Sequence, residues 1–191
     1  MSIMQPCLLL FGLILSSTGD TSQNQTVQVV PSLDLSRYAG TWYEIARFPN
    51  RFQQSCAGDV TATYTLLDNG DVEVVNRCRK DDGGWIEANG IARRLSEEEP
   101  TSKLQVRFAP AWLSFLPFVW GNYWVIDLAE DYSFALVADP DREFLWVLAR
   151  MPSLDDTTYA SLMETARRQG FDTSRVVRTS HSAETGSGKN D

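Results

Sequence analysis

Hydrophobic and polar residues alternate through the middle of the chain with the period of two that is typical of half-buried strands. The clearest pair, 60–66 and 72–77, flanks the turn residues Asn69-Gly70 and predicts a β-hairpin. Turns rich in Gly, Pro, Asp and Glu separate the other segments. The predicted strands are 41–48, 60–66, 72–77, 85–93, 103–108, 123–128, 132–138 and 144–150. Eight strands in up-and-down order predict an all-β fold, an eight-stranded antiparallel barrel whose interior can hold one small ligand.

After the last predicted strand the hydrophobic period becomes that of an amphipathic α-helix. Ser153 is the predicted N-cap, with Asp156 three residues later, and Gly170 is predicted to end the helix. The apolar positions of its inner face are Tyr159, Leu162, Met163 and Ala166. We expect one C-terminal α-helix packed outside the barrel, followed by an edge strand within 174–179.

The two ends of the chain differ from the middle. Residues 7–15 form an apolar run that is too short to span a bilayer, followed by small and polar residues. This pattern predicts a signal peptide at 1–19, and a buried N-terminal strand is the alternative. Small residues do not precede Cys7 as in a lipoprotein processing site, so a lipid anchor is not expected. A polar linker (20–32), a domain (33–178) and a disordered tail (179–191) complete the predicted division.

Export would place the remaining cysteines, Cys56 and Cys78, in an oxidising compartment where they can form a disulfide. Cys56 precedes the second predicted strand and Cys78 ends the third, so both lie at the same end of the hairpin. Simple register pairs Cys78 with a residue near Val60 or Thr61. The loop before the second strand must therefore fold back by a few residues for the bridge to form.

Composition and charge narrow the function classes. The 191 residues are 43% hydrophobic and 22% charged, which is ordinary for a globular protein, and the formal net charge of −8 argues against nucleic-acid binding. The only histidine, His181, lies in the polar C-terminal tail, so we expect neither Ser-His-Asp nor Cys-His catalysis. The sequence also lacks a Walker loop, a GxGxxG motif and a CxxC motif. We therefore expect no metal site and no cofactor.

Three motifs in order resemble the lipocalin family. They are Gly40-Thr41-Trp42-Tyr43, the segments Tyr123-Trp124-Val125-Ile126 and Asp131-Tyr132-Ser133-Phe134-Ala135-Leu136-Val137, and Leu145-Trp146-Val147-Leu148-Ala149-Arg150. The predicted helix also follows in the family's place, so the resemblance covers about 33–178. Within the family, the run 41–48 is most similar to bacterial lipocalins of the Blc type and to apolipoprotein D.

The resemblance implies how the barrel is oriented. Gly40, Trp42 and Arg150 would close one end, with the Arg150 guanidinium lying across the Trp42 ring as a structural cation–π cap. The connections 49–59, 79–84, 109–122 and 139–142 would lie at the open end.

Alternation along the strands identifies candidate ligand-binding residues inside the barrel. If Trp42 points inward, alternate residues of its strand share its face, and the more apolar faces of the other strands are assigned similarly. The candidates are Glu44, Ala46, Phe48, Tyr64, Val74, Asn76, Val106 and Phe108. Such a lining suits an acyl chain. The alternative is that these side chains fill the barrel as a solid core.

Two features are expected at the open end. The basic residues there are Arg47, Arg51, Arg77, Arg79, Lys80 and Arg107. Of these, Arg51 and Arg79 are the candidates to bind a phosphate headgroup, and a solvated strand face is the alternative. The segment 110–120 is unusually apolar for a loop and includes Trp112 and Phe115. It could plug the cavity, act as a ligand lid, touch a membrane surface or form a homodimer interface.

Together these patterns predict a non-enzymatic protein that binds and carries or stores lipids or other small hydrophobic molecules, such as fatty acids or lysophospholipids. The resemblance implies an exported protein of the periplasm or outer membrane, with a role in maintaining the membranes of a bacterial envelope. The alternative is an enzyme that uses the same cavity, with Glu44 and Tyr64 for acid–base chemistry.

Overall fold

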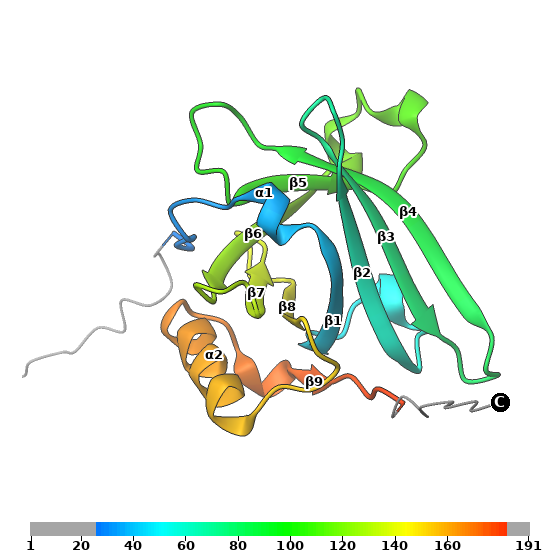
Figure 1. Cartoon of the computed structure of the whole chain (residues 1–191), viewed down its shortest axis with the longest axis vertical. Coiled ribbons are helices and arrows are strands. Elements are labelled where there is room, and N and C mark those ends of the chain that lie inside the picture. The colour runs from blue at the N-terminus through cyan, green and yellow to red at the C-terminus, as the bar shows by residue number, and fades with distance from the viewer. Residues whose placement is uncertain (1–25, 183–191) are drawn as a thin grey trace, which may run out of the picture.

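Antiparallel strands close into a barrel in the computed structural model, which describes residues 26–182 (Figure 1). The barrel strands are β1 (Gly40–Arg47), β2 (Gly58–Leu66), β3 (Val72–Arg79), β4 (Trp85–Arg94), β5 (Lys103–Arg107), β6 (Gly121–Leu128), β7 (Phe134–Ala138) and β8 (Leu145–Ala149). Each strand pairs with the next along the chain, and β1 pairs with both β2 and β8, which closes the barrel. The predicted eight-stranded barrel is confirmed, whereas the predicted signal peptide lies outside the described residues.

The β2–β3 hairpin forms at the predicted turn. Leu66 pairs with Val72, and the Leu67 N–H donates to the Asp71 carbonyl across the turn. Gly70 has a φ of +84°, a left-handed conformation that favours glycine.

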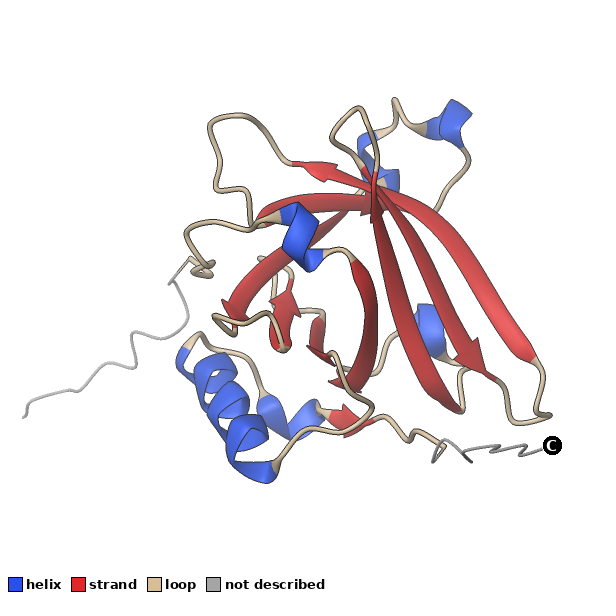
Figure 2. Ribbon diagram, viewed as in Figure 1, coloured by secondary structure: helices blue, strands red, loops and turns tan. Residues whose placement is uncertain are grey.

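Helix α2 (Asp156–Arg168) packs outside the barrel, as expected (Figure 2). Its N-cap is Asp155 and not Ser153: the Asp155 carboxylate accepts the Thr158 N–H, and Leu154 packs against the barrel, so the chain stays extended up to Asp155. Gly170, with a φ of +83°, follows the helix as predicted. The Phe171 N–H then donates to the Ala166 carbonyl, which closes the last turn.

Two of the predicted cavity residues, Ala46 and Phe48, lie outside the cavity because β1 contains a β-bulge. Glu44 pairs with Leu148 of β8, but Ala46 pairs with Val147, so one extra residue interrupts the alternation. Ala46 therefore packs in the outer apolar cluster between the barrel and α2. Phe48 lies in the same cluster, with its ring centroid 6.3 Å from that of Phe171. Neither side chain lines the interior.

The closed end includes a short helix that the sequence patterns did not predict, α1 (Leu35–Tyr38). The Trp42 indole N–H donates to the Tyr38 carbonyl at 2.8 Å, and Arg150 lies over the Trp42 ring with its guanidinium carbon 3.9 Å from the ring centroid. The same guanidinium donates to backbone carbonyls of 37–39. This is the capped geometry that the resemblance implied.

Packed residues extend beyond the predicted domain limits at both ends. Val27, within the predicted linker, is buried in the outer cluster, and the Val30 N–H donates to the Val125 carbonyl. After α2 the chain forms the 3-10 turn η5 (Thr173–Arg175) and the edge strand β9 (Val177–Arg178), which pairs with β1. Residues 179–182 lie within the predicted disordered tail, but they are held against the barrel by hydrogen bonds. Thr179 and His181 bond to Glu44, and Ser182 bonds to Asp59. Within 26–182, no helix is long and apolar enough to cross a membrane.

Candidate ligand-binding site

The barrel encloses a cavity of about 1250 Å³, so its interior is not a solid core. This volume exceeds the roughly 300–1,000 Å³ of most small-molecule pockets, and it is large enough for a lipid chain. Predicted site residues that line it are Glu44, Arg51, Tyr64, Val74, Asn76, Val106 and Phe108. Predicted site residues outside the lining are Ala46, Phe48, Arg79, Trp112 and Phe115. The side walls are mainly aliphatic, from Val72, Val74, Ala92, Leu104, Val106 and Leu148.

Three tyrosines form a hydrogen-bonded group in the lining, which we call the tyrosine floor. The Tyr123 hydroxyl lies 2.8 Å from that of Tyr38 and 2.9 Å from that of Tyr64. Burial raises the pKa of Tyr64 to about 12 and the pKa values of Tyr38 and Tyr123 well above that of a free phenol. All three hydroxyls are therefore protonated at physiological pH.

Only Tyr64 of this group was among the predicted site residues. Tyr123 belongs to a recognised motif, but nothing in that motif singles out its hydroxyl. Tyr38 lies in a single helical turn, which is too short to produce a periodic pattern.

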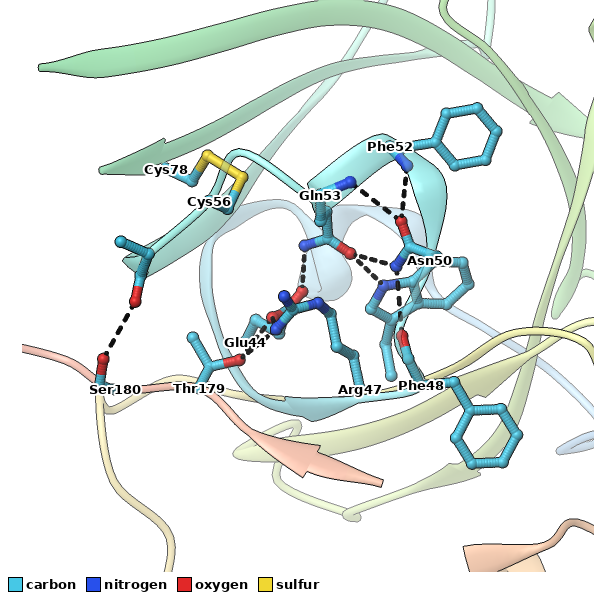
Figure 3. A network of polar contacts seen from close by, with 12 residues as sticks. Glu44, Arg47, Phe48, Asn50, Phe52, Gln53, Cys56, Cys78, Thr179 and Ser180 are labelled. Carbon is cyan, nitrogen blue, oxygen red and sulfur yellow. Dashed lines mark hydrogen bonds and ion pairs between the residues drawn. A yellow bond between two sulfur atoms is a disulfide. The ribbon is translucent and has the colours of Figure 1, made fainter. Parts of the chain in front are cut away.

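A polar network centred on Glu44 holds the first open-end loop against the barrel (Figure 3). The buried Glu44 carboxylate accepts hydrogen bonds from the Gln53 amide and the Thr179 hydroxyl, each at 2.5 Å, and pairs with Arg47 at 3.2 Å. Gln53 lies on the 3-10 turn η2 (Arg51–Gln53), and its amide oxygen accepts the Trp146 indole N–H at 3.2 Å. The network therefore links η2, β1, β8 and the C-terminal segment.

The predicted disulfide joins this same loop to β3. Cys56 and Cys78 are bonded, with their Cα atoms 5.5 Å apart (Figure 3). The register of β2 and β3 shifts between Gly58 and Thr61, and the Ala57 N–H donates to the Arg79 carbonyl. This irregularity is the fold-back that brings Cys56 beside Cys78, and it confirms the predicted bridge.

The C-terminal segment 179–182 engages Asp59 at the start of β2. The Asp59 carboxylate accepts hydrogen bonds from the Ser182 backbone and hydroxyl, and pairs with Arg79 at 2.5 Å. Burial alone would raise the pKa of Asp59, but the bonds from Arg79 and Ser182 outweigh it and lower the pKa to about 2. Arg79 therefore forms an ion pair with Asp59 and does not line the cavity.

The predicted basic rim is only partly available to a ligand. Arg47 and Lys80, like Arg79, form ion pairs with carboxylates, and Arg107 is buried near the Trp120 ring. Three arginines line the cavity and form no ion pair within the described part of the chain, namely Arg51, Arg77 and Arg175. The sequence patterns did not identify Arg175, which η5 brings to the mouth. The connection between β7 and β8 contributes acidic lining from Asp139, Asp141 and Glu143, so the rim carries both charges.

The apolar loop between β5 and β6 forms two separate 3-10 turns, η3 (Ala111–Leu113) and η4 (Pro117–Val119). Phe118 and Trp120 contribute to the lining of the cavity. Trp112 and Phe115 do not, and they are 73% and 75% exposed. These two side chains are thus neither a plug nor part of the cavity wall.

Comparison with known proteins decides the family. A family model described as a lipocalin-like domain matches residues 33–181. The chain belongs to the lipocalin family. Lipocalins bind small hydrophobic ligands, which agrees with the cavity.

The relatives include the subgroups that the sequence resembles. Over 163 residues the chain is 38% identical to temperature-induced lipocalin-1 of Arabidopsis thaliana, covering 84% of this chain and 86% of that protein. Over 152 residues it is 41% identical to outer membrane lipoprotein Blc of Escherichia coli K12, covering 79% and 81%. Apolipoprotein D of Mus musculus is 31% identical over 159 residues, covering 79% and 78%. The solved structure of insecticyanin from Manduca sexta superimposes with a TM-score of 0.64 at 20% identity, covering 83% and 86%, which supports the fold.

Proposed function

We propose that this lipocalin is an exported, non-enzymatic carrier or store of lipids, acting in the periplasm or outer membrane of a bacterial envelope to maintain its membranes. The open apolar cavity of about 1250 Å³ is the observation that carries this proposal. The Cys56–Cys78 bridge favours an oxidising compartment, and the name of the Blc relative favours the outer membrane.

The geometry favours binding over catalysis in this cavity. Glu44 already accepts hydrogen bonds from Gln53 and Thr179 and is paired with Arg47, so it is poorly placed to take a proton from a substrate. Tyr64, with a pKa raised to about 12, is a weak acid and is scarcely ionised at neutral pH.

We propose that fatty acids and lysophospholipids bind with the acyl chain along the aliphatic walls and the headgroup at the mouth. A guanidinium offers paired donors to a phosphate, and Arg51 lines the mouth without an ion pair in the described part of the chain.

Titration with palmitic acid or a palmitoyl lysophospholipid is expected to quench tryptophan fluorescence saturably at one ligand per chain, because Trp120 and Trp146 line the cavity. Arg51→Glu is expected to weaken the lysophospholipid about fivefold more than the fatty acid, through loss of a charge-assisted contact to phosphate. Arg168→Glu, on the exposed side of α2, is the charge-matched control. Lack of saturable binding for both lipids contradicts the carrier function, and equal weakening of both by Arg51→Glu contradicts the headgroup position.

We further propose that the exposed aromatics at the mouth, Trp112, Phe115 and Phe118 with Phe52 on η2, dock the mouth on a membrane surface for loading or release. Burying one such side chain contributes roughly 1.5–3 kcal/mol, so two or three support weak, reversible docking without a lipid anchor.

Trp112→Ser/Phe115→Ser is expected to reduce co-sedimentation with phosphatidylcholine vesicles at least about tenfold, since it removes two apolar side chains from the docking surface. Uncharged vesicles suit a protein with a net charge of −8. Met151→Ser is the control, because Met151 is exposed but lies beyond β8 at the closed end. If the wild type is a dimer that the double variant splits, and neither binds vesicles, the loop is a homodimer interface.

A further inference from the structure

The tyrosine floor is a polar group at one end of a cavity with largely aliphatic walls. Its members come from distant parts of the chain, with Tyr38 on α1, Tyr64 on β2 and Tyr123 on β6. The Tyr38 ring lies on Trp42 at the closed end, with ring centroids 4.7 Å apart. The cluster is therefore at the end of the cavity opposite to Arg51 and η2, where the buried end of an elongated ligand would lie.

The tyrosine floor contains more hydroxyl hydrogens than its internal hydrogen bonds can use. Each phenol carries one hydroxyl hydrogen, so the three tyrosines have three donors. Only two hydroxyl–hydroxyl contacts join them, from Tyr123 to Tyr38 and from Tyr123 to Tyr64. At most two hydrogens are used within the cluster, and at least one O–H is left to donate to another acceptor. All three residues line the cavity, so a ligand can supply that acceptor.

The charges near the cluster favour an uncharged acceptor. Two charged groups act on the floor, Glu44 from within the cavity and Arg150 from behind Trp42. Arg150 directs its donors to backbone carbonyls, including those of Thr41 and Ala39, and does not line the cavity. The Glu44 carboxylate lies toward η2, where it bonds to Gln53 and pairs with Arg47, so it offers no charge partner at the floor. An ionised group at the floor would thus lose its hydration without a cation to pair with.

We propose that the tyrosine floor is a ligand subsite that binds a neutral oxygen, a hydroxyl or carbonyl, at the buried end of an elongated apolar ligand. The proposal rests on the lipid-carrying function and specifies which lipids are preferred: those with an oxygen at the far end of the chain as well as a headgroup at the mouth. A plain acyl chain would still enter, but it would leave the spare O–H without a partner.

Two acids of equal chain length test this preference, palmitic acid and ω-hydroxypalmitic acid, which differ only by a hydroxyl at the end away from the carboxylate. An apolar cavity floor would penalise the added hydroxyl, because burying it costs a hydration shell. The tyrosine floor is expected to reverse that order, with the ω-hydroxy acid binding about fivefold more tightly to the wild type. Fluorescence titration and calorimetry measure both dissociation constants.

The matching variant is Tyr38→Phe/Tyr64→Phe/Tyr123→Phe. Removing all three hydroxyls together leaves no orphaned partner, so the apolar contacts and the fold are expected to persist, whereas Tyr123→Phe alone would strand two hydroxyls. The triple variant is expected to bind palmitic acid within about twofold of the wild type and to lose the preference for the ω-hydroxy acid. Tyr43→Phe is the control, since Tyr43 does not line the cavity.

The outcomes separate the two proposals. Saturable binding of both acids, with palmitic acid the tighter ligand of the wild type, overturns the subsite and leaves the carrier function standing. A preference for the ω-hydroxy acid that survives in the triple variant also overturns it. If the triple variant does not fold, the relative affinity of the wild type for the two acids is still a test: tighter binding of the ω-hydroxy acid supports the subsite, and tighter binding of palmitic acid contradicts it. No saturable binding of either acid contradicts the carrier function and the subsite with it.

Discussion

Trp42→Ala is expected to lower the free energy of unfolding by about 3–5 kcal/mol, which is the usual cost of removing a large aromatic side chain from a core. Trp42 is fully buried, packs against Tyr38 and bonds to its carbonyl. Its loss would leave a void at the closed end that the surrounding strands cannot fill. Urea unfolding followed by circular dichroism measures the change.

Arg150→Ala is the comparison variant at the same end. The guanidinium is partly exposed, so water can reach the carbonyls that it leaves, and the expected loss is smaller, about 1–2 kcal/mol. Trp42 is not part of the cavity lining, so the folded fraction of Trp42→Ala should bind palmitic acid with little change. A Trp42→Ala protein of normal stability that has lost binding would place Trp42 in the ligand site instead.

Cys56→Ser/Cys78→Ser is expected to destabilise the protein by about 3 kcal/mol, because the bridge closes a loop with a sequence separation of 22 residues and restricts the unfolded chain. The same measurement on the wild type in reducing agent should give a matching loss, since both remove the same bond. Reduction that leaves the wild type unchanged would contradict the prediction.

Local effects of the bridge can be separated from the global loss. The bridge anchors the loop that carries Gln53, so hydrogen exchange should rise first at 50–57 in the double variant. Peptide mapping of the oxidised protein provides an independent check, because free thiols at both Cys56 and Cys78 would show that no bridge forms.

Much of the architecture follows from local sequence. Asn69-Gly70 specifies the hairpin because a left-handed turn residue is needed there, and Gly70 adopts that conformation. Gly170 ends α2 for the same reason. Strand alternation and the Trp42 and Arg150 motifs were sufficient for the barrel and its family, because burying one face of each strand imposes a period that is visible without any partner.

Tertiary structure decided the contents of the site. Because of a single bulge at Glu44–Ala46, Ala46 and Phe48 lie on the outer face of the barrel, buried beneath α2, and not in the predicted interior. One extra residue reverses the alternation, and nothing in the local pattern marks its place. Arg79 pairs with Asp59 and so does not line the cavity, whereas η5 places Arg175 at the cavity mouth. The tyrosine floor unites residues of α1, β2 and β6. Such a cluster exists only once barrel closure brings the hydroxyls of Tyr38 and Tyr64, far apart in the chain, within 3 Å of the Tyr123 hydroxyl. Periodicity reports which face of an element is buried, whereas the chemistry of a cavity depends on which buried faces meet.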